Sequence, residues 1–197
     1  MSEPHNAGSD APSDWVVRWG HLIAPGGRVL DLACGYGRHA RYFAASGHSV
    51  VACDRDREAL ASLAGVTGVE PVLADLEDGS AWPFGQGGFD GIVVTNYLHR
   101  PVFPEIEGAL APGGVLIYET YVLGNERYGK PSNPRFLLKR DELLEAFGRG
   151  LVVTGYEQGR VRRGKTALIQ RLCAVRRNHV ENDLEPRNEP DAVKILG

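Results

Sequence analysis

The stretch that decides the fold is Val29-Leu-Asp-Leu-Ala-Cys-Gly-Tyr-Gly37. It opens as a short apolar run, which is typical of a buried strand, and it ends in a turn that contains Gly35 and Gly37. These glycines let the backbone approach a ligand closely, and the free N–H groups of a following helix would point at that ligand. We expect that helix over residues 38–46, because Gly47 stands where helices often end. The stretch therefore predicts a strand, a ligand-binding turn and a helix.

The same alternation of strand and helix continues along the chain. Short apolar strands that alternate with helices favour a parallel sheet covered on both faces. A polar loop over residues 121–135 and a helix over 139–147 follow, and then two strand-like runs that predict an antiparallel hairpin. We therefore expect an α/β fold with a doubly wound, mostly parallel seven-stranded sheet. The strands are expected at 28–33, 49–54, 69–74, 89–95, 115–120, 151–158 and 166–175, and the other helices at 14–22, 56–64 and 101–110.

Length and composition indicate one folded domain. The chain has 197 residues and a net charge of -3, which suits a single domain of about 100–200 residues. No apolar run approaches the roughly 18 residues of a membrane-spanning helix, and residues 1–13 lack a signal-peptide core. Three cysteines without metal-ligand spacing argue against a disulfide scaffold or a zinc module and predict a cytoplasmic location. We expect a flexible N-terminus over 1–12, a domain over 13–177 and a mobile acidic tail over 178–197.

The charge is distributed unevenly along the chain. Residues 1–126 hold 7 Lys/Arg against 16 Asp/Glu, whereas residues 127–177 hold 13 against 4. Such a basic segment could meet an anionic substrate or a nucleic acid. Its cations could equally pair with the acidic half of the chain. Both interpretations stay open at the level of the sequence.

Three acids stand where the expected strands end, and in an open parallel sheet ligands bind outside those ends. Asp31 suits a ligand with a positive ammonium group rather than a pyrophosphate. Asp54 follows Gly37 by seventeen residues, and its carboxylate could accept both ribose hydroxyl hydrogens. Asp75 could accept an amino hydrogen of adenine while Leu76 covers the ring. Helix capping by Asp54 and Asp75 is the structural alternative, and the glycine turn taken alone also fits a dinucleotide fingerprint.

At these positions the sequence resembles the class I S-adenosylmethionine (SAM) dependent methyltransferases. The stretch 29–37 is similar to their first motif, with Ala33 where many members carry a glycine, and Asp54 and Asp75 match their next two acidic positions. The run Leu110-Ala-Pro-Gly-Gly114 before the fifth strand and the closing hairpin also match. The resemblance covers roughly residues 12–176 and implies a Rossmann-like fold and methyl transfer from SAM, with S-adenosylhomocysteine as the product.

The resemblance also implies which residues bind the cofactor. The turn with Asp31 would hold the methionine portion, Asp54 the ribose hydroxyls and Asp75 the adenine. Asn96 and Tyr97 would line the space near the sulfonium. The expected cofactor-binding residues are Asp31, Ala33, Cys34, Gly35, Tyr36, Gly37, Asp54, Arg55, Asp75, Leu76, Asn96 and Tyr97, and no metal is expected.

Two segments could bind the methyl acceptor. The fourth strand ends in Thr95-Asn-Tyr-Leu-His-Arg100, which lacks the Asn/Asp-Pro-Pro-aromatic signature of amino-group methyltransferases. The loop over 119–136 is long, and such loops are usually functional or disordered. Its cations, Arg127 among them, could hold an anionic acceptor, and an apolar stripe with Trp15 and Trp19 could either close as a lid or pack on the sheet. The expected catalytic residues are Tyr97, His99, Tyr121, Arg127 and Tyr128, although His99 could also make an ordinary backbone contact.

The compact size and the run over 133–144 are similar to small bacterial tellurite-resistance (TehB-like) and thiol methyltransferases. This resemblance implies a small-molecule acceptor such as a thiol or a chalcogen, which is already a nucleophile and needs no strong base. Three alternatives stay open: an RNA or protein methyltransferase that docks through residues 127–177, a non-catalytic SAM-binding protein, and, least favoured, a nicotinamide dehydrogenase, because Asp31 is poorly placed for phosphate.

Overall fold

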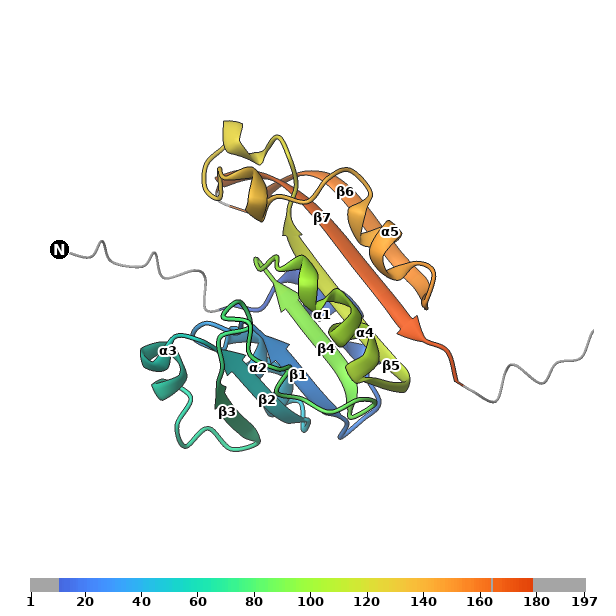
Figure 1. Ribbon diagram of the computed structural model, residues 1–197. Coiled ribbons are helices and arrows are strands. Elements are labelled where there is room, and N and C mark those ends of the chain that lie inside the picture. Colours follow the sequence, from blue (N-terminus) through green and yellow to red (C-terminus); the bar gives the residue numbers. More distant parts are fainter. Residues whose placement is uncertain (1–10, 164, 179–197) are drawn as a thin grey trace, which may run out of the picture.

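A seven-stranded sheet organises the computed structural model, which describes residues 11–163 and 165–178. The strand order is β3-β2-β1-β4-β5-β7-β6, with β1 to β5 parallel and β7 antiparallel to both of its neighbours (Figure 1). The predicted Rossmann-like, mostly parallel sheet with a C-terminal antiparallel hairpin is therefore confirmed. The parallel strands are β1 (Arg28–Leu32), β2 (Ser49–Asp54), β3 (Val69–Leu73), β4 (Phe89–Thr95) and β5 (Leu110–Tyr121).

Helices cover both faces of the sheet because both sets of alternating strand residues are apolar. Leu30 and Leu32 face a core shared with α4 (Phe103–Ala109) and α5 (Glu142–Phe147), which lie in front of the sheet in Figure 1. Val29 faces the opposite core, against α1, α2 and α3. These helices span Asp14–Trp19, Arg38–Ala45 and Arg57–Ala61.

Several expected boundaries shift. The helices expected over 14–22 and 101–110 are mixed, because η1 (Gly20–Leu22) and η2 (Arg100–Val102) are 3₁₀ turns that tighten their ends. The helices expected over 56–64 and 139–147 shorten to α3 and α5. The tight turn expected at 111–114 lies inside β5, where the pairing with β4 shifts register.

The closing hairpin is longer than predicted. The connection expected over 159–165 is instead part of β6 (Leu151–Arg163) and β7 (Lys165–Arg176), and Gly159 pairs in register with Ile169. Glycine weakens a strand only by its local preference, and the long antiparallel ladder overrides that preference. The hairpin is therefore confirmed, but the connection predicted over 159–165 was too long, since β6 extends to Arg163 and β7 begins at Lys165.

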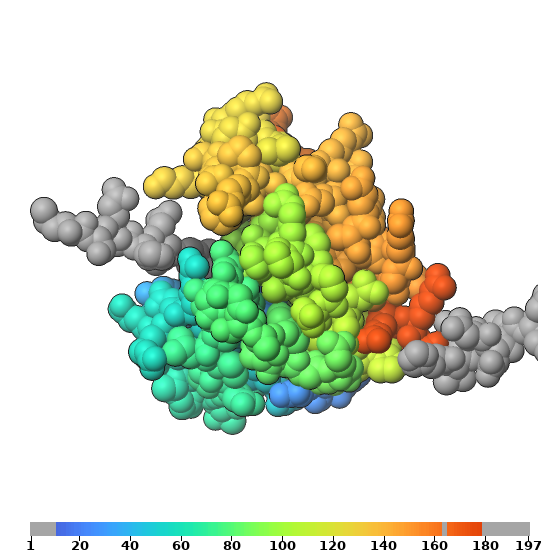
Figure 2. Space-filling model, viewed as in Figure 1, coloured from blue at the N-terminus to red at the C-terminus, as the bar shows by residue number. Residues whose placement is uncertain are grey.

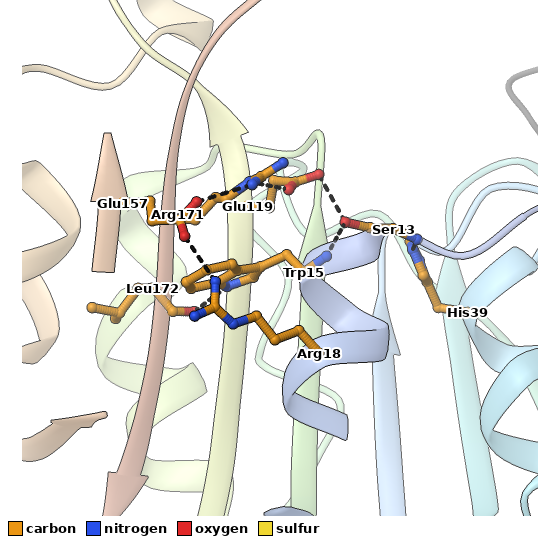
Figure 3. Close-up of polar contacts among 8 residues, drawn as sticks. All are labelled: Ser13, Trp15, Arg18, His39, Glu119, Glu157, Arg171 and Leu172. Atoms are coloured by element: carbon orange, nitrogen blue, oxygen red, sulfur yellow. Dashed lines mark hydrogen bonds and ion pairs between the residues drawn. The ribbon is translucent and has the colours of Figure 1, made fainter. Parts of the chain in front are cut away.

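The first described residues pack onto the sheet. Ser13 caps α1 by accepting a hydrogen bond from Trp15 N, and it donates its hydroxyl to Glu119 Oε1 at 3.1 Å (Figure 3). Trp15 is 2% exposed and donates Nε1–H to the Leu172 carbonyl at 3.2 Å. Of the two alternatives for the aromatic stripe, the structure shows packing on the sheet.

Some of the predicted ion pairing between the two halves of the chain is present. Arg171 of the basic segment contacts Glu119 at 2.7 Å and Glu157 at 3.1 Å. Glu157 in turn contacts Arg18 of α1 at 2.9 Å, which ties the first helix to the hairpin (Figure 3). Part of the basic segment is therefore used within the fold.

Almost all of the predicted flexible N-terminus (1–12) and acidic tail (178–197) lies outside the described residues. None of the helices within the described ranges is both long and apolar enough to cross a membrane. The cytoplasmic location stays a prediction.

Candidate cofactor and active site

The turn after β1 has an unusual backbone that opens the site. Ala33, Gly35 and Gly37 all have positive φ angles, of 53°, 54° and 73°. Positive φ is ordinary for glycine but strained for Ala33, which explains why a glycine at this position would be easier to accommodate. Asn96, directly after β4, is also strained at φ 56°. Strained backbone of this kind clusters at functional sites, and these two residues lie beside the same cavity.

Asp54 connects the turn to the end of β2. Its Oδ2 accepts the Gly35 N–H at 2.7 Å and its Oδ1 accepts the Asp56 N–H at 2.8 Å. Each carboxylate oxygen can accept a further hydrogen bond. Asp54 therefore holds the local backbone and keeps the capacity to accept two hydroxyl hydrogens from a ligand. In place of the capping alternative, Asp54 and Asp75 each close a short turn, since Asp75 Oδ1 accepts the Glu77 N–H at 2.9 Å.

A cavity of about 450 Å³ lies at the carboxyl ends of the strands, which is within the usual range for ligand pockets. The segment 121–140 (yellow) overhangs the cyan and green part of the chain in Figure 2. The cavity is lined by Ala33, Cys53, Asp54, Arg55, Ala74, Asp75, Leu76, Glu77, Asn96, Tyr97, Leu98, Pro131 and Phe136.

The structure brings seven of the predicted cofactor residues to this cavity. They come from the ends of four different strands and are Ala33, Asp54, Arg55, Asp75, Leu76, Asn96 and Tyr97. Cys34, Gly35, Tyr36 and Gly37 form the adjoining turn but do not line the cavity itself. Arg55 and Asp75 approach each other at 3.9 Å on its rim, where a partly exposed ion pair contributes little stability.

Asp31 lies beneath the turn rather than on the cavity surface. Its side chain is 1% exposed, and its Oδ2 accepts the Ala40 N–H at 2.9 Å from the first turn of α2. Burial raises the pKa of Asp31 from 3.8 to about 7, with opposing contributions from the Ala40 hydrogen bond and from Arg38. Beside it, His39 Nε2 accepts the Ser13 N–H at 3.1 Å, which requires Nε2 to be unprotonated. Asp31 therefore positions the turn and the start of α2 in this structure.

The predicted catalytic residues are spread over three places. Tyr97 lines the cavity, and burial, followed by Glu77 and Asp75, raises the pKa of its phenol, so that it stays protonated near neutral pH. His99 lines a larger neighbouring cavity of about 1330 Å³, which shares Asp75 and Leu76 with the first one. Tyr121, Arg127 and Tyr128 line neither cavity. Arg127 and Tyr128 lie exposed on and directly after η3 (Asn125–Arg127).

Six lining residues were not predicted from the sequence. Cys53, Ala74 and Leu98 are apolar neighbours of predicted residues, and Glu77 follows Leu76 closely. Burial raises the pKa of Cys53 to about 12, so this thiol is not an activated nucleophile. Pro131 and Phe136 come from the long loop after β5. The loop was predicted to form a wall of the site through its cations and tyrosines. Instead, its apolar residues Pro131 and Phe136 line the cavity, and these were not predicted from the sequence.

Together, the parallel sheet, the strained turn and the acids at consecutive strand ends match the arrangement expected of class I SAM-dependent methyltransferases. In agreement, residues 29–114 match the methyltransferase domain family. These findings confirm the predicted resemblance to the class I SAM-dependent methyltransferases.

Individual known proteins resemble parts of the chain. A demethylmenaquinone methyltransferase of Clavibacter sepedonicus is 37% identical over 114 residues, which are 52% of this chain and 45% of that protein. The chain spans about half the length of the curated relatives it matches.

Two solved structures illustrate the shared fold. TehB from Haemophilus influenzae has a TM-score of 0.70 at 19% identity, over 84% of this chain and 63% of that one. The 1,6-didemethyltoxoflavin-N1-methyltransferase of Burkholderia thailandensis, solved with its substrate and S-adenosylhomocysteine, has a TM-score of 0.62 at 21% identity, over 83% of this chain and 76% of that one. At these identities the similarity establishes the fold.

Proposed function

We propose that this protein transfers a methyl group from SAM to a small-molecule acceptor and releases S-adenosylhomocysteine. The observation that carries the proposal is that Asp54, Asp75 and Asn96, from the ends of β2, β3 and β4, line one cavity beside a glycine turn. SAM supplies its own electrophilic methyl group when bound, so the chain has to align the acceptor and exclude water.

The residues at the cavity suit the parts of the cofactor. Asp54 has one free acceptor site on each carboxylate oxygen for the ribose hydroxyls. Asp75 and Leu76 lie together on the wall, where a carboxylate can accept an amino hydrogen and an aliphatic side chain can cover a purine ring. The methionine portion would lie against the turn over 33–37, which Asp31 holds from beneath.

The acceptor class is a finer part of the proposal. We propose a small acceptor such as a thiol or a chalcogen, which is supported by the similarity over residues 133–144 noted above. Tyr97 is protonated near neutral pH and would donate a hydrogen bond rather than take a proton. An acceptor that is already nucleophilic fits such a wall, because it needs no strong base.

Calorimetric titration of the purified protein with SAM, S-adenosylhomocysteine and NADH tests the cofactor. We expect micromolar affinity for the first two ligands and none for NADH. Binding of NADH alone would refute the proposal. An acceptor screen that starts with thiols and chalcogen oxyanions then follows product formation. If the cofactor binds but no acceptor is turned over, the alternative of a non-catalytic SAM-binding protein gains support.

A second candidate function is methylation of RNA or of a protein. The observation in its favour is a group of exposed cations along the loop that borders the cavity: Arg127, Lys130, Arg135 and Lys139. Binding of RNA through these cations would weaken steeply with salt. RNA affinity that is absent or independent of salt would remove this candidate.

A further inference from the structure

The long loop after β5 contributes an aromatic side chain to the cofactor cavity. Phe136 lines this cavity, yet it is 46% exposed and belongs to the short 3₁₀ turn η4 (Pro134–Phe136). A half-exposed residue on a short turn has few apolar contacts of its own to fix it, and such segments open easily. Its position therefore depends on how the backbone on either side of it is held.

Arg100 holds that backbone on both sides. This residue begins η2, just after β4, and its guanidinium donates to the carbonyl of Arg135 at 3.1 Å and to the carbonyl of Leu137 at 3.0 Å. These are the two residues that flank Phe136. The same guanidinium forms a two-pronged contact with Glu142 of α5, with Nε–Oε1 at 2.5 Å and Nη2–Oε2 at 3.0 Å. Arginine is suited to such a fork because its donors are planar and fixed.

Arg100 and Glu142 together form a clamp on the backbone around Phe136. Glu142 stands at the start of α5. Its Oε2 also accepts the Lys139 N–H at 2.6 Å, so that one carboxylate connects Arg100 to the backbone that follows the loop. Burial acts to raise the pKa of Glu142, but the hydrogen bonds from Arg100 and from Lys139 hold this pKa below its usual value. The pair is therefore ionised at neutral pH.

Asn125 fixes the other lining residue of the loop by a separate route. It is 1% exposed, its Nδ2 donates to the Pro131 carbonyl at 3.2 Å, and its Oδ1 accepts the Leu168 N–H of β7 at 3.0 Å. Pro131 is thus tied to the hairpin, whereas Phe136 is tied to η2 and α5. The backbone after Phe136 is also anchored by Leu138, which is buried and donates its N–H to the Tyr121 carbonyl at 2.9 Å. The contribution of Arg100 is therefore measured against this common background, which an Arg100 variant leaves unchanged.

We infer that Arg100 is a positioning residue that holds Phe136 against the cofactor cavity and thereby sets the affinity for the ligand bound there. Arg100 lines neither cavity described above, so it acts through Phe136 rather than by touching the ligand. The identity of the ligand rests on the proposed function. The clamp itself rests on the contacts of Arg100.

The test compares R100M with R140M. Methionine keeps an unbranched apolar stem but removes every guanidinium donor, and Arg140 is a matched control because it is 86% exposed and contacts only its neighbour Asp141 in the pairs seen here. Loss of the Phe136 contact should weaken S-adenosylhomocysteine binding roughly tenfold in R100M, a typical effect of one lost anchor, and R140M should bind like the wild type. Amide hydrogen exchange over residues 135–138 should quicken in R100M alone.

The variant F136A shows whether Arg100 acts through Phe136. If it does, R100M/F136A binds S-adenosylhomocysteine no more weakly than F136A, because a residue that acts only through another shows no additional effect. Additive losses, or an R100M affinity equal to that of the wild type, would overturn the inference. Should R100M fail to fold, R100K keeps the charge without the fork, and its affinity should lie between those of the wild type and F136A. An R100K affinity equal to the wild type would also overturn it.

The proposed function and the clamp can fail separately. If the wild type binds neither SAM nor S-adenosylhomocysteine, the proposed function is refuted. The inferred effect of Arg100 on S-adenosylhomocysteine affinity is then refuted as well. Exchange over residues 135–138 still reports on the clamp in that case. Unchanged exchange in R100M would show that Arg100 does not hold the loop.

Discussion

Replacing Asp31 by asparagine should stabilise the free protein at alkaline pH and make its stability less dependent on pH. Asparagine has nearly the same shape, and its carbonyl oxygen can still accept the Ala40 N–H. The substitution removes a carboxylate that is 1% exposed and lies under the glycine turn. At alkaline pH this buried group has to carry a charge. Because the pKa of Asp31 is raised in the folded state, the folded protein binds a proton that the unfolded chain has already released.

The size of the effect follows from the pKa values. The pKa of Asp31 rises from 3.8 to about 7, so at pH 8 its ionisation destabilises the fold by at most about 4 kcal/mol, at about 1.4 kcal/mol for each pKa unit. The new amide N–H₂ of D31N loses part of this gain, since an unpaired buried donor costs about 1–3 kcal/mol. The expected net increase in the free energy of unfolding at pH 8 is therefore about 1–3 kcal/mol. Below the unfolded pKa of 3.8 the carboxyl is protonated in both states and this gain disappears.

Urea unfolding of both proteins between pH 4 and pH 8 measures this difference directly. All other titrating groups are common to the two proteins, so the difference in free energy of unfolding reports on Asp31 and on its contact with His39, whose Nδ1 lies 4.0 Å from Asp31 Oδ1. It should grow as the pH rises from about 4 to about 7 and level off above that range. A difference that stays constant across this range would show that Asp31 does not ionise with a raised pKa in the folded protein. A D31N variant that is less stable at every pH would show that the cost of the buried amide donor outweighs that of the buried charge.

Three further substitutions test the site and its frame. D54A should weaken S-adenosylhomocysteine binding by about 1.5–3 kcal/mol through lost charge-assisted hydrogen bonds, as measured by calorimetry. S13A removes the cap of α1 and the hydrogen bond to Glu119, and should lower the free energy of unfolding in urea by about 1–2 kcal/mol. G37A should lower the free energy of unfolding by about 2–4 kcal/mol in the same assay. The φ angle of Gly37 is 73°, and an added Cβ would lie 2.5 Å from Leu63 Cδ2.

Each of these expectations has its own contrary result. Unchanged affinity in D54A would place the ribose elsewhere. Wild-type stability of S13A would mean that Trp15 and the Arg18–Glu157 contact hold α1 without the cap. T154A, a change on the hairpin, serves as a control for a routine hydroxyl loss. For G37A the control is G35A, where φ is also positive but no atom lies within 4 Å of the added Cβ. Equal losses in both glycine variants would mean that backbone strain, rather than contact with Leu63, accounts for the effect.

The amino-acid sequence was sufficient to predict the sheet and most of the cofactor end of the cavity. Each strand carries its own apolar run, and Asp54, Asp75 and Asn96 follow directly at the ends of three of them. Parallel strands bring their carboxyl ends to one edge, so local pattern alone places these side chains together. The hairpin was recognised as well, but its length was underestimated, because the pairing of Gly159 with Ile169 depends on the facing strand and not on the local preference of glycine.

The positions of the strands along the chain and the acids at their ends were thus determined by the sequence itself, since both depend on neighbours along the chain. Only the tertiary structure decided that Asp31 is covered by the turn, and that Phe136 rather than Arg127 or Tyr128 reaches the cavity. The path of a long loop is set by contacts that close it in space, such as the bond from Arg100 to a carbonyl thirty-five residues away. No pattern within the loop specifies those partners, because they lie on other elements and meet the loop only when the sheet has formed.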